Sequence, residues 1–523
     1  MTSTKLLRGR RELQRPRGPE DERLPLGRTT AFGAQHVLTM YGAIVAVPLI
    51  IGQAAGLAPE RIALLISSCL LMGGLATCLQ SLGLPLLGSK LPLVQGVSFA
   101  GVAPMLAILA GDGGISAIMG AVIVSSAAGL LLAGGFSRVI RFFPPVVTGT
   151  MITVIGISLL PVAINWSAGT TDGSPPSNRA IALAGITLLI VLLLSKVGIG
   201  IVSRLSILLS FVLGTGVAAL LGMTDFSRVG DGALISFPTP LAFGPPTFEV
   251  AAIISMLIVV LVTMTETTAD ILAVGEITGA TITSKRVANG LRADMASSMV
   301  APFFNSFTQT AFAANVGLVA VTGVRSRFVV AAAGFIMIGL GLLPVVGEVV
   351  AAIPEPVLGG ASIVLFGTVA SSGVRTLSKV DFGNSMNLVI VAVAFAFGLI
   401  PVAAPDFYQG FPSWIQTILG SGISAAAVVA IVLNLLFNSF TAGTPENPNN
   451  LGASPVRVIP TAALQMLREG DRMVNGKMVD SEGNEVAAVP EHHMDDIREL
   501  IDTGEITHTG QIPKVLAAKG ERE

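Results

Sequence analysis

Apolar stretches of about 20 residues follow one another through most of this 523-residue chain, separated by short polar or Gly- and Pro-containing segments. About 20 apolar residues form a helix long enough to span the hydrocarbon core of a bilayer. The pattern predicts about 14 membrane spans between residues 31 and 440, centred near residues 42, 71, 100, 125, 154, 187, 212, 260, 296, 316, 336, 365, 393 and 426. Polar tails are expected over residues 1–30 and 441–523.

Two segments of this apolar region are too polar to be simple anchors. Residues 308–325 contain three threonines, Gln309, Asn315 and two glycines, and residues 91–104 place Gln95 between two prolines. Polar groups occur at membrane depth where they are buried in protein or line a cavity. Both segments are therefore predicted to be broken helices. Their half-helix N-termini would direct backbone N–H groups at a polar ligand, as in the binding site of a transporter.

The two halves of the apolar region resemble each other. The pattern P-V-x-x-G-x6-G begins at Pro145 and again at Pro356, and a Phe-Ala pair begins at Phe99 and again at Phe312. An offset of seven spans, an odd number, makes the two halves enter the membrane in opposite directions. The sequence thus predicts an inverted repeat with a ligand near the midplane, where the broken helices meet; chance matching in a Gly-rich chain is the alternative. The predicted repeats are residues 31–222 and 247–440.

Basic residues alternate between the loops. The N-terminal tail is rich in Lys and Arg, which places it in the cytoplasm by the positive-inside rule. Every second loop is basic as well, with Lys90, Arg138, Arg141, Lys196, Arg204, Lys285, Arg286, Arg292, Arg325, Arg327, Arg375 and Lys379. The opposite loops contain only Arg61, Arg179 and Arg228. We therefore expect a multi-pass protein of the cell membrane, with an even number of spans and both termini in the cytoplasm.

Composition supports the same class. The chain is 52% hydrophobic and 12% charged, with a mean hydropathy of +0.78, whereas a soluble domain has about a quarter charged residues. An all-α polytopic membrane protein is therefore expected. Cys69 and Cys78 lie nine residues apart on one predicted helix, too far apart for a disulfide. In the C-terminal tail, amphipathic helices are possible around Thr461–Arg468 and Met494–Ile501.

Chemical motifs of other protein classes are missing from the sequence. It contains no metal-ligand cluster, no Ser/His/Asp constellation and no G-x-x-x-x-G-K-[ST] loop. An enzyme, a cofactor, a bound metal and ATP-driven transport are therefore not expected.

Ionisable residues deep in the predicted spans are few: Glu266, Asp270, Asp294 and His36. Because a carboxylate is costly at the bilayer centre, each acid is a candidate functional group. Glu266 and Asp270 are four residues apart and share one helix face. Two carboxylates in a poorly hydrated site are not easily ionised together. This suits a proton-coupled carrier, in which a carboxyl group alternates between protonated and charged forms.

Each of these residues also has a structural interpretation. Glu266 and Asp270 would then only hydrogen-bond helices together, Asp294 would be an interface acid paired with Arg292 or with the loop above, and His36 would be a packing or hydrogen-bonding residue. The functional interpretation assigns Asp270 and Asp294 to coupling or gating and His36 to tuning a gate or supporting the site.

Five motifs carry a family resemblance, and they occur in order between residues 31 and 440: Gln35–Gly42 (QHVLTMYG), Pro92–Ala100 (PLVQGVSFA), Gly290–Asp294 (GLRAD), Ala314–Gly323 (ANVGLVAVTG) and Pro356–Gly360 (PVLGG). Together they resemble the nucleobase–ascorbate transporters, also called nucleobase:cation symporter 2 or the xanthine/uracil permease family. The fourth motif is similar to the family signature [QEP]-N-x-G-x-x-x-x-T-[RKG].

The resemblance implies a fourteen-span fold of two inverted seven-span repeats, with short extended segments in the broken spans 3 and 10. A core domain of spans 1–4 and 8–11 would hold substrate against a gate domain of spans 5–7 and 12–14. It further implies homodimers and elevator-like motion. Glu266 matches the glutamate that binds the ring N–H of the base, Asp294 an aspartate needed for transport, and His36 the first-span histidine. The implied substrate-binding positions are Glu266, Ala314, Asn315, Ser98, Phe99 and Ala100, and the signature adds Gly317 and Thr322.

One signature position departs from the family pattern. Ala314 stands where the family has Gln, Glu or Pro. Gln would contact a purine edge and Glu a uracil edge, and alanine can do neither through its side chain. Spans 12 and 13 look closer to xanthine and uric acid permeases. The expected function is therefore a proton-coupled symporter that imports an oxidised purine, xanthine or uric acid, without any nucleic-acid partner.

Several alternatives stay open. The substrate could be uracil or another pyrimidine, and the coupling ion could be sodium. An inorganic-anion carrier on the same architecture is a rival, although carboxylates in the site would repel an anion. A membrane nucleobase sensor that signals through residues 441–523 is a rival from another functional class.

Overall fold

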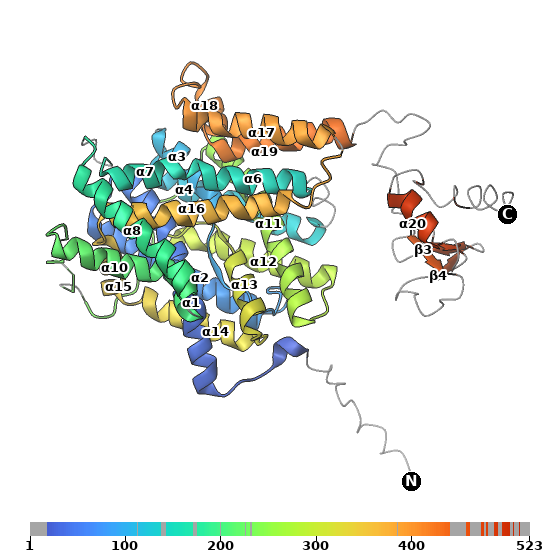
Figure 1. The fold of residues 1–523 in the computed structure, drawn as a ribbon, viewed down its shortest axis with the longest axis horizontal. Helices are drawn as coiled ribbons and strands as arrows, with labels where there is room; N and C mark the ends of the chain where they lie inside the picture. The colour runs from blue at the N-terminus through green and yellow to red at the C-terminus, as the bar shows by residue number, and fades with distance from the viewer. Residues whose placement is uncertain are drawn as a thin grey trace, which may run out of the picture. The chain divides into compact units, whose positions relative to one another are not determined.

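A computed structural model describes most of the chain. The described residues are 18–111, 113–136, 143–170, 175–198, 200–224, 226–227, 229–230, 233–383, 385–439, 457–460, 472–474, 477–479, 486–489, 494–502, 506 and 512. The chain divides after Ile431 into a large helical unit and a small second unit. Each unit is described by itself (Figure 1).

The first half of the helical unit contains one short strand among helices of very different lengths. Its elements are η1 (Pro19–Asp21), α1 (Leu26–Ala54), α2 (Pro59–Leu82), β1 (Gln95–Val97), η2 (Phe99–Gly101), α3 (Val102–Ala110), α4 (Gly114–Leu132), η3 (Ala133–Gly135), α6 (Pro145–Ser158), α7 (Leu160–Ala168), α8 (Asn178–Val197), α9 (Ile201–Arg204) and α10 (Ser206–Leu220).

The second half has a similar order, with its strand again after two long helices. Its elements are α11 (Val250–Thr278), α12 (Ser284–Val300), η5 (Ala301–Phe304), β2 (Gln309–Ala311), α13 (Ala313–Thr322), α14 (Arg327–Gly341), α15 (Pro344–Ala351), α16 (Glu355–Leu377), α17 (Ser385–Ala403), α18 (Ser413–Leu419) and α19 (Gly422–Asn434), followed by a short π-helix, Leu435–Ser439.

Helix boundaries follow local sequence signals. Helix α2 begins at Pro59, where the missing N–H of proline costs nothing. Helix α11 ends at Gly279, which is left-handed with a φ of 75°. The next helix, α12, begins after Thr283, whose hydroxyl accepts a hydrogen bond from the backbone N–H of Arg286 at 3.2 Å.

Helix length and composition agree with a membrane protein. Among the described residues, eight helices are long and apolar enough to cross a bilayer, or nine if the pair α14–α15, bent by 78°, counts as one span. Four shorter apolar helices accompany them. All of the predicted span centres fall in helical residues. The expectation of a predominantly helical, multi-pass membrane protein is confirmed, whereas the number of spans stays a prediction.

Helices from the two halves pack against each other. Helix α2 lies against α14, α4 lies against α11 and α12, and α6 lies against α16; the last pair runs side by side in Figure 1. The approach of α6 to α16 requires glycine, because a Cβ on Gly156 would lie 2.3 Å from the backbone N of Ala370. Small residues permit such close backbone contacts between apolar helices.

Strands β1 and β2 form an antiparallel pair in the interior of this unit. Gly96 is opposite Thr310, and all residues of both strands are buried. Each strand is followed by a short helix, η2–α3 after β1 and α13 after β2. Both segments thus have the predicted extended backbone followed by a short helix, whereas their assignment to broken membrane spans stays a prediction.

After the end of α19 and the π-helix, the described residues of the second unit contain short strands and one α-helix. Strands β3 (Arg457–Pro460) and β6 (Val486–Val489) pair in parallel, and β4 (Arg472–Val474) pairs with β5 (Lys477–Val479) in antiparallel fashion. Helix α20 (Met494–Asp502) confirms the helix predicted at Met494–Ile501. The helix predicted at Thr461–Arg468 lies outside the described residues. In the first unit, Cys69 and Cys78 both lie on α2 as free thiols, as expected.

Candidate functional site

The two strands are held by matching hydroxyl groups. The backbone N–H of Gln95 in β1 donates to Thr77 Oγ1 on α2 at 2.9 Å. The backbone N–H of Gln309 in β2 donates to Ser298 Oγ on α12 at 2.8 Å. All four side chains are buried. Because these contacts satisfy strand N–H groups that would otherwise lack partners in the interior, they fix the position of both strands.

Thr267 on α11 connects the acidic residues to β2. Its hydroxyl donates to Asp294 Oδ2 at 2.5 Å, accepts from the backbone N–H of Ala311 at 3.4 Å, and lies 3.2 Å from Thr310 Oγ1. Because its single proton goes to the carboxyl group, Thr310 must be the donor in the Thr267–Thr310 contact. One hydroxyl therefore links an acid on α12 to the backbone of the broken helix.

The three candidate acids lie together. Asp270 lies close enough to Glu266 and Asp294 to interact electrostatically with both. Asp294 is 1% exposed and Asp270 9%, whereas Glu266 is half-buried. Arg292 does not pair with Asp294, because its guanidinium donates to Asn289 Oδ1 instead. The expected pairing of Asp294 with Arg292 is therefore wrong, and Thr267 is its hydrogen-bond partner instead.

His36 on α1 and Asn315 on α13 have neighbouring side chains. Asn315 Nδ2 donates to the backbone O of Pro92, just before β1, at 2.8 Å. The signature asparagine thus ties α13 to the segment that leads into β1. The His36 side chain lies beside that of Asn315 and is buried in α1. This contact fits a supporting role for His36 and places it away from the exposed surface.

The predicted substrate-binding residues Ser98, Phe99 and Ala100 lie at the start of η2. Ser98 Oγ accepts from the backbone N–H of Ala100 at 3.2 Å and so caps this turn. Ser98 and Ala100 are buried, while Phe99 is only partly buried. The Phe99 ring meets Phe366 of α16 edge-on, with centroids 6.2 Å apart. Sequence reasoning did not single out Phe366.

The signature segment forms all of α13. Ala314 is exposed in its first turn, and a Cβ on Gly317 would have no neighbour within 4 Å. This face of α13 is therefore open and built from small residues. At the other end, Thr322 Oγ1 donates to the backbone O of Leu318 at 2.7 Å, and Gly323 is left-handed with a φ of 67°. The last two signature residues thus terminate the helix rather than line the site.

Several buried polar atoms around the strands have no partner among the described residues. They are both amide atoms of Gln95, His36 Nδ1, Asp294 Oδ1, Thr308 Oγ1, Gln309 Oε1 and Asn315 Oδ1. The Gln95 side chain lies next to Asp294, but the two make no hydrogen bond of normal geometry. Buried polar groups normally pair. Amide and carboxyl groups that still have donors and acceptors to offer suit a small ligand with polar edges, or a proton.

The structure brings most of the predicted residues together. Helix α11, which carries Glu266 and Asp270, contacts β2, α13 and η2, and Thr267 on the same helix links Asp294 to β2. No group of three or more His, Cys, Asp or Glu side chains that could hold a metal ion occurs among the described residues. Sequence reasoning assigned no role to Thr267 or Ser298. Their hydroxyls in otherwise apolar or small-residue helices were the available signal.

Comparison with known families gives one match that covers most of the helical unit. Residues 27–407 match a family model described as "Permease family". Similar curated proteins include the xanthine permease of Bacillus subtilis, which is 38% identical and matches over 79% of this chain and 95% of its own length. The uric acid transporter UacT of Escherichia coli is 40% identical over 82% and 89%, respectively. The xanthine permease XanP of Escherichia coli is 32% identical over 80% and 93%.

Solved structures with a similar fold are far more distant in sequence. The transmembrane domain of the cyanobacterial bicarbonate transporter BicA aligns with a TM-score of 0.53 at 14% identity, covering 80% of this chain and 99% of that domain. The structure of SLC26A9 aligns with a TM-score of 0.55 at 12% identity, covering 80% of this chain and 67% of the other. At such low identity these likenesses concern the fold alone.

Proposed function

Because the chain belongs to the permease family that includes the xanthine and uric acid permeases, we propose that it imports an oxidised purine, xanthine or uric acid, together with protons. Family membership makes the protein a membrane transporter of the nucleobase class rather than an enzyme. The finer assignment of substrate and coupling ion rests on the site.

The observation that carries the proposal is the cluster of three acids beside the broken helices. Glu266 is the least buried of the three, so it is the group best placed to bind a ring N–H of the substrate. Asp294 is held by Thr267, whose hydroxyl also bonds β2. A change in the charge of Asp294 would therefore alter the support of the strand. We assign Asp270 and Asp294 to proton coupling and Glu266 to substrate binding.

The remaining substrate contacts would come from the ends of the two broken helices. Ser98, Phe99 and Ala100 would offer backbone groups and an aromatic ring, and Asn315 would fix the second segment. Ala314 would leave room at the open face of α13. A flat heterocycle with polar edges fits such a site, because aromatic and backbone surfaces contact its faces and edges. The xanthine and uric acid permeases among the relatives favour an oxidised purine.

We further propose fourteen spans in two inverted repeats, with residues 31–440 as the transporter domain and cytoplasmic tails over 1–30 and 441–523. Packing supports the repeat. An offset of seven spans relates α2 to α12 and α4 to α14, and the α2–α14 contact has its counterpart in α12–α4. The contact of α1 with α14 likewise corresponds to that of α11 with α4. Core and gate domains, elevator-like motion, a homodimer and a place in the cell membrane complete the proposal.

Transport assays test the proposal directly. Cells that lack their own purine carriers would express the chain and receive radiolabelled xanthine, with unlabelled urate, uracil, guanine or ascorbate as competitors, with and without a proton uncoupler. We expect uptake that urate inhibits and the uncoupler abolishes. Uptake that uracil alone inhibits would assign a pyrimidine substrate, and uptake that follows a sodium gradient would overturn proton coupling.

Two other functions would give different results in the same cells. The shared fold with a bicarbonate transporter makes an inorganic-anion carrier the main rival; bicarbonate or sulfate flux without purine uptake would establish it. A nucleobase sensor would bind the base without flux, and deletion of residues 441–523 alone would then produce a phenotype. The acids in the site oppose the first rival, because they repel anions.

A further inference from the structure

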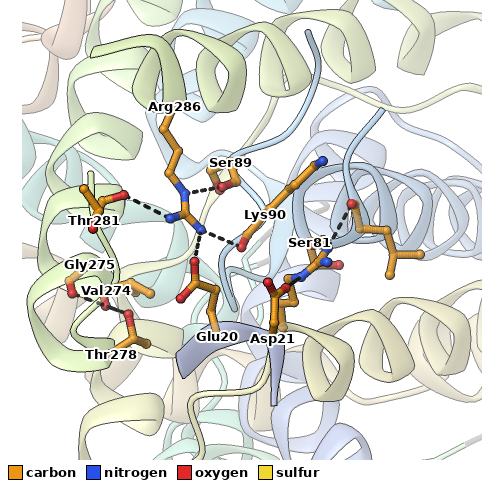
Figure 2. A network of polar contacts seen from close by, with 12 residues as sticks. Glu20, Asp21, Ser81, Ser89, Lys90, Val274, Gly275, Thr278, Thr281 and Arg286 are labelled. Atoms are coloured by element: carbon orange, nitrogen blue, oxygen red, sulfur yellow. Dashed lines mark hydrogen bonds and ion pairs between the residues drawn. The ribbon is translucent and has the colours of Figure 1, made fainter. Parts of the chain in front are cut away.

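A short acidic segment precedes the first long helix, α1. It forms ion pairs with two arginines from distant parts of the chain. Glu20 Oε1 in η1 lies 2.7 Å from Arg286 Nη2 at the start of α12. Asp21 Oδ1 lies 2.6 Å from Arg327 Nε at the start of α14. Figure 2 shows Glu20 and Asp21 side by side beneath these contacts. The segment falls within residues 1–30, which the hydropathy pattern assigned to a polar tail.

The Glu20–Arg286 pair is not an ordinary surface contact, whereas in the second pair the Asp21 side chain is 32% exposed. Glu20 is only 7% exposed, and the side chains of both arginines are less than one-fifth exposed. Exposed ion pairs contribute little to stability, but removing one partner of a buried pair leaves an uncompensated charge. Ser326 adds a third contact, because its Oγ donates to the backbone O of Glu22 at 2.5 Å. The segment is therefore fixed to the helical unit at three successive residues.

Arg286 uses its remaining donors on backbone carbonyls. Its Nε donates to the O of Ser89 at 2.7 Å, its Nη2 to the O of Lys90 at 2.9 Å, and its Nη1 to the O of Thr281 at 3.0 Å (Figure 2). One guanidinium thus joins the loop before β1 to the turn between α11 and α12. Its planar fork of donors allows this, and the single ammonium group of lysine would not.

Arg327 holds the end of a helix in the same way. Its Nη1 donates at 3.0 Å to the carbonyl oxygens of Ser81 and Leu82, the last residues of α2. Terminal carbonyls of a helix have no partner within the helix. With Asp21 bonded to the same guanidinium, Arg327 fastens the end of α2 to the start of α14.

The loop that Arg286 holds leads directly into the candidate site. Lys90, in a left-handed conformation with a φ of 58°, is followed two residues later by Pro92, whose carbonyl oxygen accepts from Asn315 Nδ2. Strand β1 begins at Gln95. Gln80 of α2 supports the same loop through Ser89 N and Lys90 N, at 3.1 and 3.0 Å. A shift of this loop would therefore move both the partner of the signature asparagine and β1.

We propose that residues 18–23 form an acidic hook, and that Glu20 and Asp21 are positioning residues for transport. By neutralising and orienting Arg286 and Arg327, the hook sets the path of the chain into β1. The groups that hold the hook, and those that Arg286 and Arg327 hold in turn, belong to α2, the α2–β1 loop, α12, the turn before it, or α14 and its N-cap Ser326. The hook therefore moves with these elements and is part of the substrate-holding side. The transport readout rests on the proposed function, whereas the stability readout does not.

The test compares two glutamates in the same segment. Glu20→Gln removes the buried charge, and Glu22→Gln makes the same chemical change at an exposed side chain. For Glu20→Gln we expect a lower melting temperature of the purified protein. We also expect a KM for xanthine raised about fivefold to tenfold at equal amounts in the membrane, equivalent to about 1.0–1.4 kcal/mol. Glu22→Gln should match the wild type in both measurements, and Glu20→Asp should recover part of the loss.

The pattern of kinetic constants separates positioning from simple destabilisation. A merely structural role predicts less protein and a lower maximal rate with an unchanged KM, and that result would overturn the proposal. So would a Glu20→Gln variant that is indistinguishable from Glu22→Gln. If the wild type transports no purine, the proposed function fails, but the melting temperatures still decide whether the hook is part of the helical unit.

A second pair of variants tests the arginine. Arg286→Lys keeps the charge opposite Glu20 but cannot hold three carbonyl oxygens together with the carboxylate. We expect its KM to rise as in Glu20→Gln, whereas Arg325→Lys, at an exposed position nearby, leaves KM unchanged. A wild-type KM for Arg286→Lys would show that the charge alone matters and that the hook does not position the loop.

Discussion

The two broken helices have the same backbone anchor and use their side chains differently. In both, a buried hydroxyl from a neighbouring helix bonds the N–H and the carbonyl oxygen of a strand glutamine: Thr77 for Gln95, and Ser298 for Gln309. The Gln309 amide then donates to Ser306 Oγ and the backbone O of Phe307. The Gln95 amide has no hydrogen-bond partner among the described residues and lies near Asp294.

This difference suggests separate roles for the two strands. Strand β2 is tied down by its own side chain and by Thr267, so it serves as a fixed support. Strand β1 has the same backbone support but retains a free amide next to an acid. Donors and acceptors that are free yet buried are available to a ligand or to a changing protonation state. We therefore expect substitutions on the β1 side to change transport more than stability, and those on the β2 side to change both.

The largest effect is expected at Glu266, on the helix that contacts both broken segments. Glu266→Gln should lower xanthine uptake at least about tenfold, because a hydrogen bond to a charged group contributes about 1.5–3 kcal/mol. The variant should still reach the membrane, as surface labelling would show. Glu276→Gln is the matched control, since Glu276 is exposed near the end of the same helix. Normal uptake by Glu266→Gln would remove Glu266 from the site.

Next in size is the loss of the hydroxyl that links the acids to β2. Thr267→Val keeps the shape of the side chain but leaves Asp294 Oδ2 and the N–H of Ala311 without this partner. An unsatisfied buried group costs about 1–3 kcal/mol, so we expect uptake to fall roughly fivefold or more. Thr268→Val is the control, because Thr268 Oγ1 bonds only the backbone O of Met264 in its own helix. Equal effects of the two changes would contradict the linking role of Thr267.

The comparison of the two glutamines is tested by the same substitution in each. Gln95→Leu should lower uptake with little loss of thermal stability, because its amide supports no protein contact of normal geometry. Gln309→Leu should lower the melting temperature, since two hydrogen bonds of about 1 kcal/mol each disappear. Purified variants would be compared by thermal unfolding and, after reconstitution, by uptake. A stability loss at Gln95 as large as that at Gln309 would break the proposed division.

The sequence was sufficient to single out the residues of the candidate site but not the contacts that connect them. Glu266, Asp270 and Asp294 stand out because acids are rare in apolar spans, and the polar broken segments stand out for the same reason. The bond from Thr267 to Asp294 depends on how two helices are rotated against each other, which hydropathy does not encode. The Glu20–Arg286 pair joins residues 266 positions apart. No periodicity or motif relates them, and a charged segment outside the spans reads as a solvated tail.

Phe366 illustrates a different limit. Its span is apolar throughout, so a phenylalanine there is indistinguishable in sequence from a residue that faces lipid or a neighbouring helix. The position of Phe366 is fixed only by the close approach of α16 to α6 at Gly156. A Cβ added to Gly156 would lie 2.6 Å from the carbonyl oxygen of Phe366. Contact with Phe99 then places it at the edge of the site. The sequence motifs were enough to identify the polar residues of the candidate site. Its aromatic neighbours could be identified only from the packing of the helices.

The smallest effect is expected on the open face of α13, where the second broken helix differs most from the family signature. Ala314→Gln would add an amide at an exposed position in the first turn, so it should fold normally and change selectivity rather than abolish uptake. We expect competition by purines to strengthen by about 1 kcal/mol, roughly fivefold, from one added hydrogen bond. Ala320→Gln, also exposed on this helix, should leave selectivity unchanged. If both variants show the wild-type ranking of competitors, the first turn of α13 does not face the substrate, and the site would have to lie closer to β1.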